Sequence, residues 1–175
     1  MAHGAVVCVF KVEQIRYDNL SPFYTTSVNL IAGAESTLSE LLIKNAYAAL
    51  LNGSLNAVRQ QKKDLIQNMR LISEILALSA VKSSQDLSMD KATFVRNVAT
   101  GLLESAVSNS LSKEVKLDEP ATLIEGAVEG LSVGLVLGLV SNKVPLEGAG
   151  DIIKSATQSA AGTTVRMGKS LQLDS

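Results

Sequence analysis

The chain has 175 residues, of which 46% are hydrophobic, and this length suits one domain with its own core. Its charge is balanced, with 16 Lys and Arg against 17 Asp and Glu, and its aromatic content is 3% with no Trp. These values argue against a nucleic-acid binder, which would show a basic excess or aromatic residues for base stacking. The single cysteine, Cys8, excludes an internal disulfide framework.

The N-terminal part of the chain has the least regular pattern. Residues 6–12, VVCVFKV, are rich in β-branched side chains, which favours a short strand or a packed arm. The apolar run at 5–10 is short for a signal peptide, and no Lys or Arg precedes it. We therefore predict an N-terminal arm at 1–25, a helical domain at 26–175, no signal peptide and, by default, a cytoplasmic location.

Five helix-length segments follow one another at a constant spacing of 29 residues. Each segment ends in serine, and its fourth residue is small or a short polar residue. The segments are 36–54, 65–83, 94–112, 123–141 and 152–170. We expect an all-α fold, an antiparallel bundle or short stack of five to six helices built on a degenerate 29-residue repeat. The alternative is a chance similarity of helix lengths.

Several residues mark the expected ends of these helices. Asp90 and Asp118 each follow an apolar residue and precede a helical pattern, which is typical of an N-cap. Thr37 with Glu40 fits a capping box. Asn52-Gly53 is a plausible C-terminal stop for the first segment, and the glycines at 148 and 150 indicate a tight connector.

The fourth segment carries a glycine at every fourth position, and this spacing places all of them on nearly one face of a helix. Each interior glycine costs a helix about 1 kcal/mol relative to alanine, so close helix packing must offset the loss. The third segment repeats the pattern more weakly. The predicted helix-packing or interaction face is Gly126, Gly130, Gly134, Gly138, Gly101 and Ser105. Packing within the chain, a contact between subunits and a membrane hairpin all remain open as its role.

The same segment is the most apolar part of the chain, but Leu123–Val140 contains Glu125 and Glu129. Because carboxylates are costly in lipid, we predict no clear transmembrane helix. The two glutamates lie four residues apart, and a solvated helix face explains them better than an acid–base pair does.

No motif predicts catalysis or cofactor binding. The chain lacks GxSxG, GxGxxG and P-loop patterns, and His3 with Cys8 cannot form a metal site alone. The basic cluster at 59–63 reads as a solvated helix end, and Arg70, Arg96 and Arg166 as isolated charges. We therefore predict that the protein is not an enzyme and has no catalytic, cofactor-binding or metal-binding residues.

The expected function is that of a non-enzymatic structural or self-assembly protein, in which small-residue helix faces permit close packing. Its expected partner is a second copy or another protein, and no nucleic acid. The first alternative is a membrane-active protein that inserts the glycine-rich region at 123–140 as a hairpin. The second alternative is a carrier of a small apolar ligand.

Overall fold

The computed structural model describes residues 40–61, 64–85, 87, 89–111 and 120–172. These residues form five helices: α3 (Glu40–Gln60), α4 (Leu65–Ser84), α5 (Lys91–Ser110), α6 (Pro120–Ser141) and α7 (Leu146–Gln172). The prediction of an all-α bundle is confirmed. The predicted arm at 1–25, the capping box at Thr37 and the cap at Asp118 lie outside the described residues.

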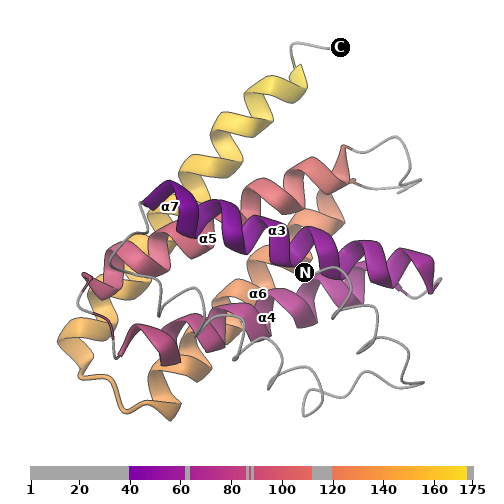
Figure 1. Ribbon diagram of the computed structural model, residues 1–175. Helices are drawn as coiled ribbons and strands as arrows, with labels where there is room; N and C mark the ends of the chain where they lie inside the picture. Colours follow the sequence, from indigo (N-terminus) through magenta and orange to yellow (C-terminus); the bar gives the residue numbers. More distant parts are fainter. Residues whose placement is uncertain (1–39, 62–63, 86, 88, 112–119, 173–175) are drawn as a thin grey trace.

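The helices form two rows (Figure 1). One row contains α3, α5 and α7 in that order, and the other contains α4 and α6. Successive helices run in opposite directions, so the neighbours within a row are parallel. Contacts between side chains within the first row join residues 50 to 62 apart in sequence. Helices of similar length would give the same offsets, so the duplication stays a prediction.

The core between the rows is almost entirely aliphatic. In the described part of the chain, its one aromatic pair is Tyr47 and Phe94, whose rings meet edge to face with centroids 6.2 Å apart. Tyr47 is fully buried, and within the described part of the chain its hydroxyl has no hydrogen-bond partner. Burial raises the pKa of the Tyr47 hydroxyl well above its ordinary value, so this residue serves the core as an uncharged ring.

Two aspartates cap helix N-termini in the described residues. The predicted cap at Asp90 is confirmed, because its carboxylate accepts a hydrogen bond of 2.7 Å from the backbone N–H of Thr93. Hydrogen bonds with Thr93 also lower the pKa of Asp90. Asp64, which the sequence patterns did not identify, caps α4 by accepting from the backbone N–H groups of Ile66 and Gln67.

The predicted helix stop at Asn52-Gly53 is wrong, since α3 continues to Gln60. Leu55 and Val58 follow the glycine at helical spacing and are fully buried. The burial of two such side chains stabilises the helix by a few kcal/mol, which outweighs the cost of about 1 kcal/mol for one interior glycine.

The predicted connector at Gly148 and Gly150 is also wrong, because both residues lie inside the first turns of α7. The chain instead reverses at residues 142–145, where Lys143 has a left-handed backbone with φ of 51°. The N–H of Val144 donates to the carbonyl oxygen of Leu139, and that of Lys143 to Val140. This pair of bonds is the Schellman motif, in which a lysine occupies the position that usually favours glycine.

Candidate functional site: small-residue contacts between helices

The glycines of α6 lie against α4, and all four are buried. The residue numbers of their nearest partners on α4 increase together with those of the glycines on α6, as expected for two parallel helices. The facing pairs are Gly126 with Ile66, Gly130 with Arg70, Gly134 with Glu74, and Gly138 with Val81. The glycine face is therefore occupied within the chain.

The approach is closest at the middle two glycines. A Cβ added at Gly130 would overlap the backbone carbonyl oxygen of Arg70 and lie 3.0 Å from the backbone nitrogen of Glu74. A Cβ at Gly134 would overlap the carbonyl oxygen of Glu74 and lie 2.9 Å from the Cβ of Ala77. Any side chain at either position would have to push the two helices apart.

Gly101 provides a similar contact between α5 and α3. A Cβ there would overlap the carbonyl oxygen of Lys44 and lie 3.3 Å from the backbone nitrogen of Ala48. One turn later, Ser105 makes a different kind of contact, because its hydroxyl and the side-chain oxygen of Asn52 form a hydrogen bond of 2.7 Å. The second predicted face thus combines one close backbone approach with a polar contact.

Ser105 belongs to a buried polar cluster. The side-chain oxygen of Asn52 also accepts from the amide of Asn109, which is 7% exposed. The guanidinium of Arg59 donates to the Asn109 oxygen over 2.7 Å. Arg59 is therefore not the solvated helix-end charge that the sequence suggested, because it reaches α5 from the last turn of α3.

The interpretation of three arginines as isolated charges is also wrong. Each arginine forms an ion pair with a glutamate on a helix of the same row, at distances of 3.1, 3.2 and 3.8 Å. The pairs are Arg70 with Glu129, Arg96 with Glu40, and Arg166 with Glu104. Most of these side chains are half exposed, so each pair contributes at most about 1 kcal/mol. Local spacing could not reveal them because the partners are distant in sequence.

The outward face of α6 changes character along the helix. Its first half exposes Glu125 and Glu129, and its second half exposes Val136, Leu137 and Val140. Among the described residues, α6 is the one helix long and apolar enough to span a membrane by length and composition, over 121–141. Half of that segment is buried in the bundle. A helix in the core of a bundle can pass the same test of length and composition.

The outward face of α7 forms an uncharged strip that the sequence patterns did not single out. Its residues follow at steps of four and three, so they share one side of the helix. They are Leu146, Gly150, Ile153, Thr157, Ala161 and Thr164, all exposed. We call this set the α7 strip. A Cβ added at Gly150 would meet no atom within 4 Å. The C-terminal end of α7 extends past the other helices (Figure 1).

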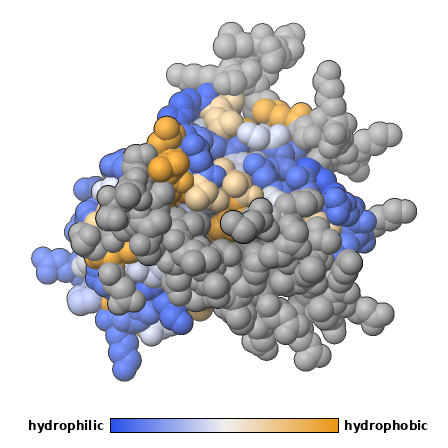
Figure 2. Space-filling view, viewed as in Figure 1, coloured by the Kyte–Doolittle hydropathy of each residue, from blue (hydrophilic) through white to orange (hydrophobic). Residues whose placement is uncertain are grey.

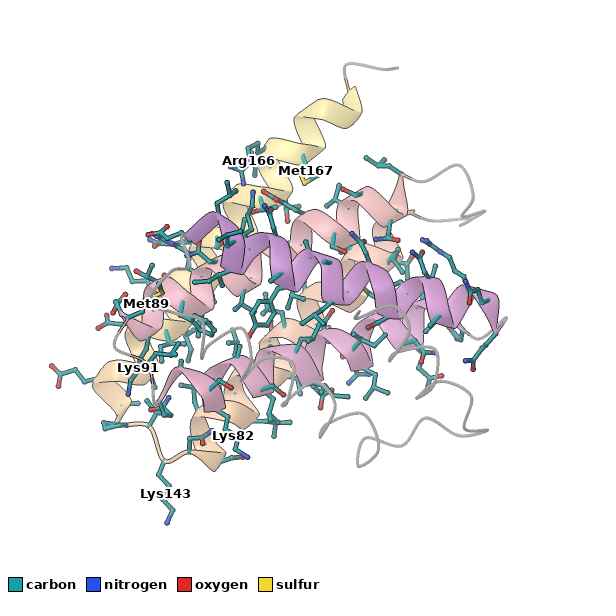
Figure 3. All side chains as sticks on the ribbon, viewed as in Figure 1. Lys82, Met89, Lys91, Lys143, Arg166 and Met167 are labelled. Atoms are coloured by element: carbon teal, nitrogen blue, oxygen red, sulfur yellow. The ribbon has the colours of Figure 1, made fainter. Side chains whose placement is uncertain are left out.

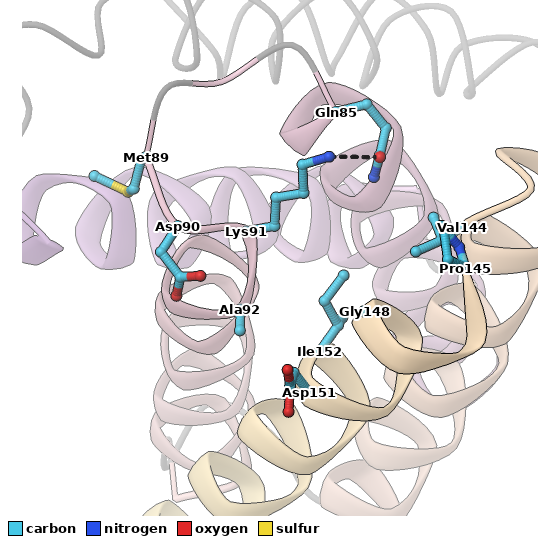
Figure 4. Close-up of a pocket in the computed structure, with 10 residues that line it drawn as sticks. All are labelled: Gln85, Met89, Asp90, Lys91, Ala92, Val144, Pro145, Gly148, Asp151 and Ile152. Atoms are coloured by element: carbon cyan, nitrogen blue, oxygen red, sulfur yellow. Dashed lines mark hydrogen bonds between the residues drawn. The ribbon is translucent and has the colours of Figure 1, made fainter.

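A pocket of about 380 Å³ lies between the start of α5 and the α6–α7 turn (Figure 4). Val144, Pro145 and Ile152 form part of its wall, but Asp90 and Asp151 also line it. Lys91, another lining residue, donates a hydrogen bond of 3.0 Å to the side-chain oxygen of Gln85. This mixed lining does not favour an apolar ligand.

Within the described ranges, no group of three or more His, Cys, Asp or Glu side chains is placed to hold a metal ion. Comparison of the chain with protein-family models, curated proteins and solved structures finds no match.

Proposed function

We propose that this protein is a non-enzymatic structural protein that assembles with copies of itself through helix faces lined by small residues. The α6 glycines belong to the inside of the bundle, because α4 occupies them. We therefore assign self-assembly to the α7 strip. The proposal rests on the exposure of this strip along most of the helix.

The internal contacts of the chain support this use of the strip. The rows of the bundle are held by small residues packed against a neighbouring helix, as at Gly130 on α4 and Gly101 on α3. The α7 strip offers the same kind of surface with no charged residue in it. A second copy of α7 would bury Leu146 and Ile153, which are 89% and 43% exposed.

The test measures molar mass by light scattering during size-exclusion chromatography, over about 1 µM to 1 mM protein. We expect wild-type oligomers, and monomers when Thr157→Glu and Ala161→Glu place two charges in the strip. The control is Gln158→Glu, which adds a charge at a neighbouring exposed position outside the strip and should leave the oligomer intact. A wild-type monomer throughout this range would refute self-assembly.

Membrane activity is the second candidate function, and the length and hydropathy of α6 favour it. Insertion of α6 would require it to leave α4, so the bundle would have to open. Dye leakage from liposomes at about pH 5 and about pH 7 tests this candidate, because a charged carboxylate opposes insertion of a helix into lipid. An absence of leakage at both values would remove this candidate.

A further inference from the structure

The apolar residues exposed on this protein are not evenly spread. On the face shown in Figure 2, they form separate patches divided by polar residues. Four large apolar side chains, in contrast, fall within eleven residues on the two sides of one tight turn. They are Val136, Leu137, Val140 and Leu146, exposed by 53%, 40%, 71% and 89%. We call this set the apolar tip.

Two lysines flank the apolar tip (Figure 3). Lys143 lies in the turn itself and extends away from the bundle, and Lys82 lies at the adjacent end of α4. Lys82 directly follows Val81, the residue on which Gly138 of α6 packs. In the described part of the chain, neither lysine has an ion pair. Lys143 also keeps a backbone conformation that would suit glycine better.

Among the described residues, the acidic groups near this turn are Glu147 and Asp151 on α7, and Asp90 at the start of α5. Glu147 and Asp151 lie about 100° and 140° around α7 from Leu146, so neither shares the side of α7 that carries the tip residue. Asp90 is engaged in capping α5. Lys143 and Lys82 thus lie at the turn and at the adjacent end of α4, whereas the carboxylates of Glu147 and Asp151 lie on other sides of α7 than Leu146.

We propose that the apolar tip docks on the surface of an anionic lipid bilayer, with Val140 and Leu146 entering the headgroup region and Lys82 and Lys143 binding anionic headgroups. This combination of a few exposed apolar side chains with nearby cations is the one that interfacial binding uses. A stable protein–protein interface needs about 20–30 residues on each side, and four side chains at the end of a helical hairpin fall far short of that.

Docking of this kind leaves α6 packed on α4, because the glycine face and the apolar tip lie on different sides of α6. It therefore differs from insertion of α6 and predicts binding without leakage. The tip shares Leu146 with the α7 strip, so the Lys82 and Lys143 variants, which lie outside the strip, test docking apart from self-assembly.

The experiment measures co-sedimentation of the full chain with vesicles of phosphatidylcholine, with or without about one third phosphatidylserine. We expect binding to the anionic vesicles, little binding to the neutral ones, and no dye leakage from either. Val140→Ser with Leu146→Ser should lower the partition coefficient by at least about tenfold. The control, Leu41→Ser with Val165→Ser, makes the same two kinds of change at exposed apolar residues elsewhere and should bind as wild type does.

The role of the lysines is tested with Lys82→Ala and Lys143→Asn. Asparagine is chosen at 143 because it tolerates the left-handed backbone there. Each lysine lost should weaken binding to anionic vesicles roughly fivefold and leave binding to neutral vesicles unchanged. The control Gln60→Glu with Gln67→Glu alters net charge equally at exposed sites away from the tip and should bind nearly normally.

Failure of the wild-type chain to sediment with anionic vesicles would overturn the proposal. So would equal losses in the tip variants and their controls, or leakage on binding, which would indicate insertion. Molar masses of the tip variants distinguish lipid docking from self-assembly. If the serine pair or the lysine pair changes the oligomeric state but not lipid binding, the tip contacts protein and the proposal is wrong.

Discussion

Alanine substitutions along α6 and α7 should separate glycines that form close contacts from those that only weaken a helix. The sharpest case is Gly130→Ala. Its new Cβ would overlap the carbonyl oxygen of Arg70 and lie 3.0 Å from the backbone nitrogen of Glu74, both part of the helix backbone of α4. Neither atom can move without displacing α4. Overpacking of this kind costs about 1–3 kcal/mol, occasionally more.

Alanine also restores about 1 kcal/mol of helix propensity. We therefore expect Gly130→Ala and Gly134→Ala each to lower the free energy of unfolding by up to about 2 kcal/mol. Gly126→Ala should instead be neutral or slightly stabilising, because its Cβ would lie 3.4 Å from the nearest atom. Gly162→Ala, with no atom within 4 Å, should stabilise by up to about 1 kcal/mol.

Urea denaturation followed by far-ultraviolet circular dichroism measures these differences, at one protein concentration because assembly would shift the midpoints. The order of stability is the test. If Gly130→Ala unfolds at the same urea concentration as Gly126→Ala, the close approach of α4 and α6 is wrong. If Gly162→Ala is destabilised as much as Gly130→Ala, the loss does not come from the contact.

Three further substitutions address single interactions. Tyr47→Phe should leave stability unchanged or raise it by up to about 1 kcal/mol in thermal unfolding, because the buried hydroxyl has no partner in the described chain; a clear loss would indicate an unseen partner. Asp90→Ala should cost about 1 kcal/mol at neutral pH through loss of the helix cap. The folded-state pKa of Asp90 is lowered, so its contribution to stability is fully present above the unfolded pKa of about 3.9. That contribution is lost as the pH falls through the folded-state pKa. The stabilities of wild type and variant should therefore converge in strong acid. Asn52→Ala should cost about 1–2 kcal/mol, since Ser105 and the buried Asn109 lose their shared acceptor; an unchanged urea midpoint would contradict the polar cluster.

Local patterns were sufficient for the features that each helix determines by itself. The apolar periodicity predicted the helices, and the apolar residue before Asp90 predicted its cap. The predictions of helix ends were wrong where contacts between helices, or a turn elsewhere in the chain, outweighed a local sequence signal. Gly53 predicted the end of the first helix, but burial of Leu55 and Val58 stabilises α3 beyond this glycine. At residues 142–145, the chain turns through Lys143, so the glycines that follow are free to lie in a helix.

The candidate contact face shows the same division. Four glycines at steps of four predicted that some helix backbone would come close to α6. They could not predict which one, because a residue without a side chain carries no charge, shape or polarity that specifies its partner. The bundle decides that it is α4, two helices earlier and parallel, and leaves α7 with an uncharged outer strip. The ion pair of Arg70 with Glu129 depends on that choice, since its two halves are brought together only by the packing of α6 on α4. Sequence periodicity thus determined which side of each helix is apolar or smooth, whereas only the packing of all five described helices decided which of those sides face each other.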